Sequence, residues 1–218
     1  MLLRMSVIAL AARKGGVGKT SLTANLAAEF LSLGFTVQVL DADPQQSLLR
    51  WAQLGQGKLA TITTSIPTED PERFKTVVKT AQKTADLVLI DTPPSFADPA
   101  LLAALLADVV LIPCGPSMLD VFPAKDMLEL LREVRTERKG NRPRIFFVPN
   151  RLLVRTNLSA DLPASLAEFG ETVLPGIAQR TVIAESTMEG LTVMEYAPNS
   201  PARREFQALA LAIKEVLS

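Results

Sequence analysis

The sequence has 218 residues, of which 48% are hydrophobic and 5% aromatic, so it is long enough to bury one aliphatic core. Basic and acidic residues number 23 each, and the resulting formal charge of zero excludes binding of a polyanion through overall charge alone. A single cysteine, Cys114, excludes a disulfide framework and fits a reducing cytoplasm.

The N-terminal segment Met1–Ala12 superficially resembles a signal peptide, because a basic residue, an apolar run and small residues follow one another. We interpret Ser6–Ala12 instead as a buried strand, since cleavage would remove the segment that presents the next motif. No later stretch approaches about 18 uninterrupted apolar residues, so no transmembrane helix is expected. Without repeats or linkers, residues 1–218 are predicted to form a single domain.

A glycine-rich motif, Lys-Gly-Gly-Val-Gly-Lys-Thr, occupies Lys14 to Thr20 directly after the first strand. It leads into Ser21–Leu33, whose apolar periodicity predicts a helix. A strand, a glycine-rich turn and a helix N-terminus together form a cradle for phosphate. Lys19 would reach the β- and γ-phosphates, and Thr20 would place its hydroxyl on Mg²⁺. The alternative is a chance turn with two solvated lysines.

Apolar runs and helical segments alternate along the rest of the chain. Further strands are predicted at Thr36–Leu40, Leu59–Thr63, Leu87–Ile90, Asp108–Pro113, Ile145–Pro149 and Thr172–Leu174. Helices are predicted at Asp70–Lys83, Pro99–Leu106, Pro123–Lys139, Leu158–Phe169 and Pro201–Leu217. Strands without clear alternation, separated by helices, predict an α/β fold with a mostly parallel sheet flanked by helices on both faces. In such a sheet ligands bind beyond the carboxyl ends of the strands.

Carboxylates stand at two of those ends. Asp41 and Asp43 close the second strand in the sequence Asp-Ala-Asp-Pro-Gln, and Asp91 closes the strand at Leu87–Ile90. Two carboxylates so close together repel each other unless a cation lies near them, and Mg²⁺ with ATP supplies one. The alternative interpretation of each motif is an ordinary turn at the end of a strand.

The phosphate loop departs from the usual P-loop pattern, because its first glycine position is Arg13 and an extra lysine, Lys14, follows. In this variant the chain resembles the ParA/MinD family of ATPases, whose loop carries a "signature" lysine at that place. The resemblance spans nearly the whole chain and includes Thr92-Pro93-Pro94-Ser95, Ile112–Asp120 and Gln179-Arg180. With no N-terminal helix-turn-helix extension, the sequence is most similar to small ParF-type plasmid partition ATPases.

The resemblance implies a role for each site residue, with ATP and Mg²⁺ as cofactors. The implied catalytic residues are Lys14, Lys19 and Asp43, with Asp43 positioning the attacking water. The implied nucleotide-binding residues are Lys14, Gly15, Gly16, Val17, Gly18, Lys19, Thr20, Ser21 and Asn150, the last at the adenine edge. The implied magnesium site consists of Thr20, Asp41, Asp43 and Asp91.

The resemblance also implies partners: a homodimer that forms on ATP binding, DNA bound without sequence preference, and a ParB-like centromere-binding activator. Lys14 would cross the dimer interface to the partner's phosphates. The protein would be cytoplasmic and nucleoid-associated, without a membrane. Arg180 is the implied DNA-binding residue. A basic stretch is a second candidate, although a self-paired, solvated helix face explains it equally well: Arg132, Arg135, Arg138, Lys139, Arg142 and Arg144.

Two other functions stay open. A MinD-like membrane-associated ATPase would need a basic amphipathic tail, whereas the C-terminal segment carries Phe206, Leu209, Ile213 and Leu217 at the spacing of a core-packing helix. A P-loop biosynthetic ligase would need a substrate pocket beside the phosphates. The nitrogenase iron protein shares the loop but needs cysteines for its cluster, and Cys114 alone cannot provide them.

Overall fold

The computed structural model describes residues 5–95, 98–138 and 140–217, so the predicted helix end at Lys139 lies outside the described residues. Within the described residues, seven parallel strands form one sheet in the order β3-β2-β4-β1-β5-β6-β7. The strands are β1 (Ser6–Leu10), β2 (Val37–Asp41), β3 (Thr63–Ser65), β4 (Leu87–Asp91), β5 (Val109–Cys114), β6 (Arg144–Pro149) and β7 (Thr172–Val173). The predicted α/β class with a parallel sheet is confirmed.

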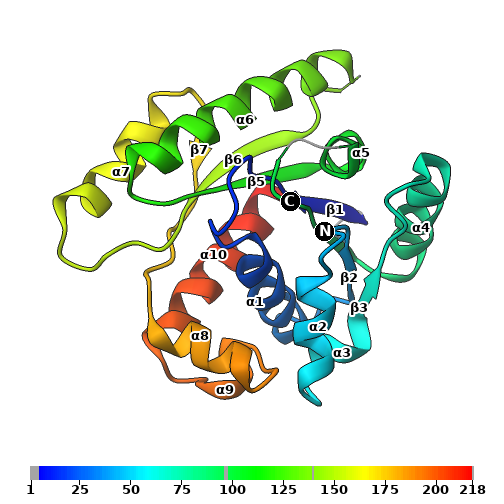
Figure 1. Ribbon diagram of the computed structural model, residues 1–218, viewed down its shortest axis with the longest axis horizontal. Helices are drawn as coiled ribbons and strands as arrows, with labels where there is room; N and C mark the ends of the chain where they lie inside the picture. The colour runs from blue at the N-terminus through cyan, green and yellow to red at the C-terminus, as the bar shows by residue number, and fades with distance from the viewer. Residues whose placement is uncertain (1–4, 96–97, 139, 218) are drawn as a thin grey trace.

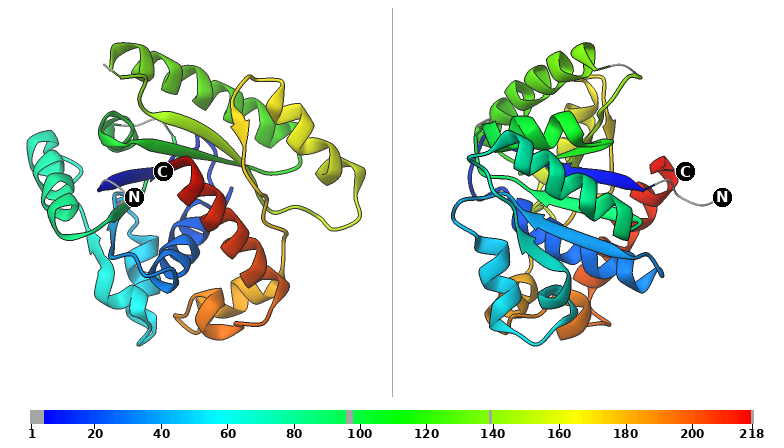
Figure 2. Two further views of the ribbon diagram at one scale, coloured as in Figure 1. Left: turned by 180° about the vertical axis from the view of Figure 1, so that it is seen from behind. Right: turned by 90° about the vertical axis from the view of Figure 1, so that its right-hand side faces the viewer.

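Helices cover both faces of this sheet. They are α1 (Lys19–Ser32), α2 (Ser47–Leu54), α3 (Lys58–Ile62), α4 (Pro71–Thr84), α5 (Asp98–Leu106), α6 (Met118–Glu137), α7 (Asn157–Ala167), α8 (Thr181–Met188), α9 (Val193–Tyr196) and α10 (Pro201–Leu217). In Figure 1, α4 to α7 lie on one side of the sheet, and α1, α2 and α8 to α10 lie on the other. Figure 2 shows the same layers from behind and from the side. Each face has its own buried apolar cluster.

The central strands β1, β4 and β5 are buried along their whole length, which explains why they are continuous apolar runs rather than alternating ones. Their register aligns the ends that matter for function. Asp91 of β4 pairs with Leu10 of β1 on one side and with Asp41 of β2 on the other. The segments that follow β1, β2 and β4 therefore begin side by side at one edge of the sheet.

Local sequence signals set the start of α4 and of α6. Asp70 caps α4 as predicted, since its carboxylate accepts the backbone N–H groups of Glu72 and Arg73 ahead of a first turn that begins with Pro71. The predicted start of α6 at Pro123 is wrong. The helix begins at Met118, because Ser117 accepts the N–H of Leu119 and so caps an earlier turn, and Pro123 lies inside the helix.

The predicted strand at Leu59–Thr63 is also wrong in most of its length. Residues 58–62 form the short helix α3, and only its last predicted residue, Thr63, belongs to β3. The backbone N–H of Lys58 donates to the Glu195 carboxylate at 3.0 Å, so a residue 137 positions away supports the start of this helix. The helices α2, α8 and α9 were not predicted.

Candidate nucleotide-binding site

The glycine-rich segment Lys14–Gly18 forms the loop between β1 and α1, at the carboxyl edge of the sheet. Gly16 and Gly18 have φ angles of +76° and +94°, which residues with a side chain rarely adopt. Gly18 precedes α1 without any side-chain cap, so the first N–H groups of the helix remain directed toward the loop. The loop is therefore shaped to hold an anion through its backbone.

Lys19 and Thr20 begin α1 and face the carboxylate at the end of β4. The Thr20 hydroxyl donates to Asp91 Oδ2 at 2.7 Å, and Lys19 is 7% exposed. Burial lowers the pKa of Lys19, although the charges of Asp91 and Asp43 oppose this effect. Burial also raises the pKa of Asp91 to about 7, while the Thr20 hydrogen bond works in the opposite direction.

Asp41 and Asp43 lie one strand further along the sheet. The backbone N–H of Asp43 donates to Asp41 Oδ1 at 3.0 Å, and the N–H of Leu49 in α2 donates to Asp41 Oδ2 at 2.9 Å. Burial raises the pKa of Asp41, and these backbone hydrogen bonds partly offset that effect. Asp43 is half-buried at the edge, with one oxygen bound to the N–H of Gln45.

The donor set fits magnesium. It consists only of hard oxygen ligands, namely the Thr20 hydroxyl and the carboxylates of Asp41, Asp43 and Asp91. Among the described residues, no three His, Cys, Asp or Glu side chains are close enough to hold a metal by themselves. This arrangement suits Mg²⁺, which commonly keeps several waters and takes the rest of its ligands from one or two side chains and substrate phosphates.

Asn150 and Arg151, which follow β6, brace the loop from the opposite side. Asn150 Nδ2 donates to the carbonyl of Val17 at 2.7 Å, and Arg151 Nη1 donates to the carbonyl of Gly16 at 2.8 Å. A side chain at Gly18 would collide with the Asn150 amide. The sequence predicts a contact of Asn150 with adenine but no contact of Arg151 with the loop, although both residues follow a strand end.

Beside the loop lies a hollow of about 990 Å³, large enough for a nucleotide. Gly16, Gly18 and Asn150 line its phosphate side, and Ile183 and Met188 of α8 line its apolar side. The loop, the residues that follow β6 and the helix α8 therefore surround this hollow, whereas Asp41 and Asp43 line a second hollow of about 480 Å³.

Lys14 and Arg180 are both engaged in ion pairs within the chain. Lys14 Nζ lies 2.6 Å from Asp120 Oδ1 in the first turn of α6. Arg180 lines the hollow, and its Nη2 lies 2.6 Å from Glu205 Oε1 of α10. The structure thus places Lys14 at the start of the phosphate loop and Arg180 in the lining of the hollow.

The basic stretch before β6 is largely self-paired. Arg132 and Arg135 both bind Glu171, and Arg142 binds Asp108. Arg138 donates to the carbonyls at the end of α5. These contacts favour a solvated, self-paired helix face over a DNA-binding surface as the interpretation of this stretch.

The C-terminal helix α10 packs into the core. Phe206, Leu209 and Ile213 are buried in the cluster that also contains residues of α1 and β2. In the part of the chain that the structure describes, no helix combines the length and the apolar character needed to cross a bilayer.

The fold and the site together define a nucleotide-binding α/β protein with a variant phosphate loop. Residues 8–193 match the family described as "CobQ/CobB/MinD/ParA nucleotide binding domain". The chain is 32% identical to the chromosome-partitioning ATPase Soj of Thermus thermophilus, over 93% of each chain. It therefore belongs to the CobQ/CobB/MinD/ParA family, as the sequence resemblance predicted.

Other similar proteins cover almost the same length. The maintenance of carboxysome distribution protein A of Halothiobacillus neapolitanus is 29% identical over 86% of each chain. The ATP complex of a Cyanothece McdA variant superposes with a TM-score of 0.77 at 20% identity, over 98% of this chain and 96% of that chain. MinD of Pyrococcus horikoshii with Mg-ADP gives 0.76 at 22% identity, over 97% and 96%. Because the identities are only 20% and 22%, these two structures show that the fold is shared and carry no argument about function.

Proposed function

We propose that this protein is a Mg²⁺-dependent ATPase that dimerises around ATP, binds DNA without sequence preference and positions a cargo, most directly a plasmid. The observation that carries the proposal is the convergence of Lys19, Asp43 and Asp91 beside the phosphate loop, with Lys14 at the start of that loop. Relatives named as partitioning and carboxysome-distribution proteins support a positioning role.

In this proposal each site residue acts on the triphosphate from a fixed place. The loop N–H groups hold the β-phosphate, Lys19 neutralises the β- and γ-oxygens, and Asn150 contacts the adenine edge. Thr20, Asp41, Asp43 and Asp91 would hold Mg²⁺, which would supply positive charge to neutralise the phosphates. Asp43, whose outer position leaves it half-buried, orients the attacking water.

Lys14 supplies the remaining positive charge, from one protomer to the phosphates of its partner. Lys14 is paired with Asp120 in the free chain, and ATP held between two protomers would give both Lys14 and Lys19 a phosphate partner. Hydrolysis then removes the charge that holds the dimer together. An activator of the ParB type would accelerate this step.

Sedimentation velocity tests the proposal with ATP, ADP or no nucleotide, each with and without non-specific duplex DNA. We expect a dimer only with ATP, co-sedimentation of DNA only with that dimer, and phosphate release that requires Mg²⁺. A monomer whose sedimentation does not change with nucleotide and that does not bind DNA would contradict the proposal and favour a biosynthetic ligase. Pelleting with anionic vesicles would favour the MinD-like alternative, which the buried apolar face of α10 does not support.

A further inference from the structure

The short helix α2 lies between the Asp41 and Asp43 carboxylates, which are proposed magnesium ligands, and α8. Its first turn is tied to Asp41, because the N–H of Leu49 donates to the Asp41 carboxylate at 2.9 Å. Gln46, directly before the helix, has a φ of +52°, a left-handed conformation that is unfavourable for a residue with a side chain. Such a conformation persists only where the surrounding structure fixes it, so the position of α2 and the position of Asp41 depend on each other.

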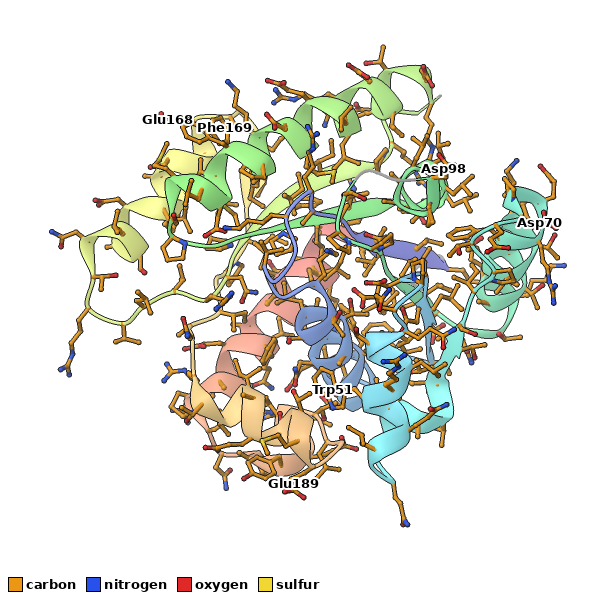
Figure 3. All side chains as sticks on the ribbon, in the orientation of Figure 1. Trp51, Asp70, Asp98, Glu168, Phe169 and Glu189 are labelled. Carbon is orange, nitrogen blue, oxygen red and sulfur yellow. The ribbon has the colours of Figure 1, made fainter. Side chains whose placement is uncertain are left out.

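The other end of α2 is fixed on the loop between α8 and α9. Trp51 is 4% exposed, and its indole Nε1–H donates to the carbonyl of Leu191 at 3.2 Å. The backbones of Gly55 and Gly190 touch, and a side chain on either residue would run into the backbone of the other. Figure 3 labels Trp51 on α2 and Glu189 at the end of α8. An eight-residue helix is only about 12 Å long, so it transmits a displacement of one end to the other.

The segment after α2 is fixed on α9 in the same way. The Glu195 carboxylate accepts the N–H of Lys58 at 3.0 Å and also closes the capping box of α9 with Thr192. Gly57 allows this approach, because a side chain there would meet the Glu195 carboxylate. The whole chain segment from Asp43 to Lys58 is therefore held between the site and the α8–α9 unit.

We propose that Trp51 and the Gly55–Gly190 contact are positioning elements for the Asp41 and Asp43 carboxylates. By fixing α2 against the loop between α8 and α9, they set the orientation in which these carboxylates meet the magnesium of a bound nucleotide, a role that rests on the proposed ATPase function. Coupling of this kind is reciprocal, so binding of Mg²⁺ with a nucleotide also changes the surroundings of Trp51.

Tryptophan fluorescence tests the reciprocal step without turnover. Trp51 is the single tryptophan of the sequence and does not line the nucleotide hollow, so its emission reports on the α2–α8 contact. We expect Mg²⁺–ADP to shift the emission more than ADP in EDTA does. Unchanged emission, while equilibrium dialysis shows bound Mg²⁺–ADP, would overturn the proposal.

Steady-state kinetics tests the positioning role itself. Trp51→Phe keeps an aromatic ring but loses the N–H donor, and Gly190→Ala forces the two backbones apart. For both variants we expect a several-fold lower kcat and a several-fold higher Mg²⁺ concentration at half-maximal rate. For Trp51→Phe we also expect a KM for ATP within about twofold of wild type, because this change alters neither the phosphate loop nor a residue that lines the hollow.

Leu131→Ala is the control, because this fully buried residue of α6 lies on the opposite face of the sheet. It should lower the denaturant concentration at the midpoint of unfolding without changing the Mg²⁺ dependence. A Trp51→Phe enzyme with wild-type Mg²⁺ dependence would contradict the positioning role. A wild-type protein that binds Mg²⁺–ADP but never hydrolyses ATP would instead contradict the proposed function, and fluorescence alone would then decide the inference.

Discussion

The ammonium group of Lys14 and the carboxylate of Asp120 form an ion pair at 2.6 Å, although the two residues are 106 positions apart. The lysine that we assign to a partner's phosphates is thus held within its own chain here. With side-chain exposures of 42% and 17%, the pair is partly screened by water, and such pairs contribute about 0.2–1 kcal/mol. Because the ion pair is this weak, a phosphate group, which carries more negative charge than a carboxylate, can displace Asp120 from Lys14.

Lys14→Ala removes the charge proposed to act across the dimer. We expect a protein that binds ATP but remains a monomer, because the loop N–H groups and Lys19 still hold the nucleotide. Sedimentation velocity with ATP, paired with a fluorescent-nucleotide binding assay, measures both properties. Arg13→Ala is the matched control, since this neighbouring cation pairs with the exposed Asp126 rather than with Asp120. An intact ATP dimer of the Lys14 variant would rule out the role in trans.

Asp120→Asn removes the competing partner of Lys14 within the chain. Each protomer then no longer loses an ion pair of about 0.2–1 kcal/mol on association, so the ATP dimer should form at a several-fold lower protein concentration. The midpoint of dimerisation, measured by sedimentation at several protein concentrations, checks this. A midpoint equal to or above that of wild type would show that Asp120 does not restrain Lys14.

Asp43→Ala should separate binding from hydrolysis. Removing the residue proposed to orient water leaves the phosphate loop complete, so we expect an ATP-bound dimer with little turnover. Lys19→Ala is the contrasting variant and should abolish nucleotide binding altogether. Phosphate release and nucleotide retention after gel filtration distinguish the two. Normal hydrolysis by the Asp43 variant would remove this residue from catalysis, and retained ATP affinity of the Lys19 variant would contradict the cradle assignment.

The elements and site residues that the sequence predicted well share local signals. The central strands are continuous apolar runs because both of their faces are buried, and the Lys14–Thr20 motif needs only its strand and its helix to define a phosphate loop. Asp91 could be placed at a strand end for the same reason. A local pattern, once recognised, fixes a local structure.

What the sequence did not predict depends on contacts between distant segments. The helix α3 forms where a strand was expected because Glu195 holds its first N–H, and α2 is fixed by Trp51 on the carbonyl of Leu191. The pairing of Lys14 with Asp120 and of Arg151 with Gly16 joins residues more than 100 positions apart. No pattern within a single segment carries such information.

The stability of the nucleotide-free protein should fall with rising pH because of Asp91. Burial raises the pKa of its carboxyl to about 7 from the usual 3.8, so between these values the folded state binds a proton that the unfolded state does not. The contribution of Asp91 to the free energy of unfolding is therefore fully present at low pH and is lost as the pH rises toward 7. Asp91→Asn removes this dependence while keeping an acceptor for the Thr20 hydroxyl.

Denaturant unfolding of both proteins in EDTA between pH 4.5 and 8 measures the effect. We expect the free energy of unfolding of wild type, relative to Asp91→Asn, to decrease steadily toward pH 7. A relative stability that stays constant or increases would show that Asp91 is ionised throughout this range.

The pairing of Arg180 with Glu205 makes the implied DNA contact testable in both directions. Arg180→Ala should weaken DNA binding by the ATP dimer and reduce the slope of log affinity against log salt by about one per arginine, because one phosphate contact is lost. Glu205→Gln should strengthen binding, since it frees the guanidinium but retains an oxygen for the N–H of Ala178. Arg132→Ala is the control, as that arginine is committed to Glu171. Fluorescence anisotropy with labelled duplex DNA across a salt series separates these outcomes. If Arg180→Ala binds with unchanged affinity and slope, the DNA surface lies elsewhere on the dimer.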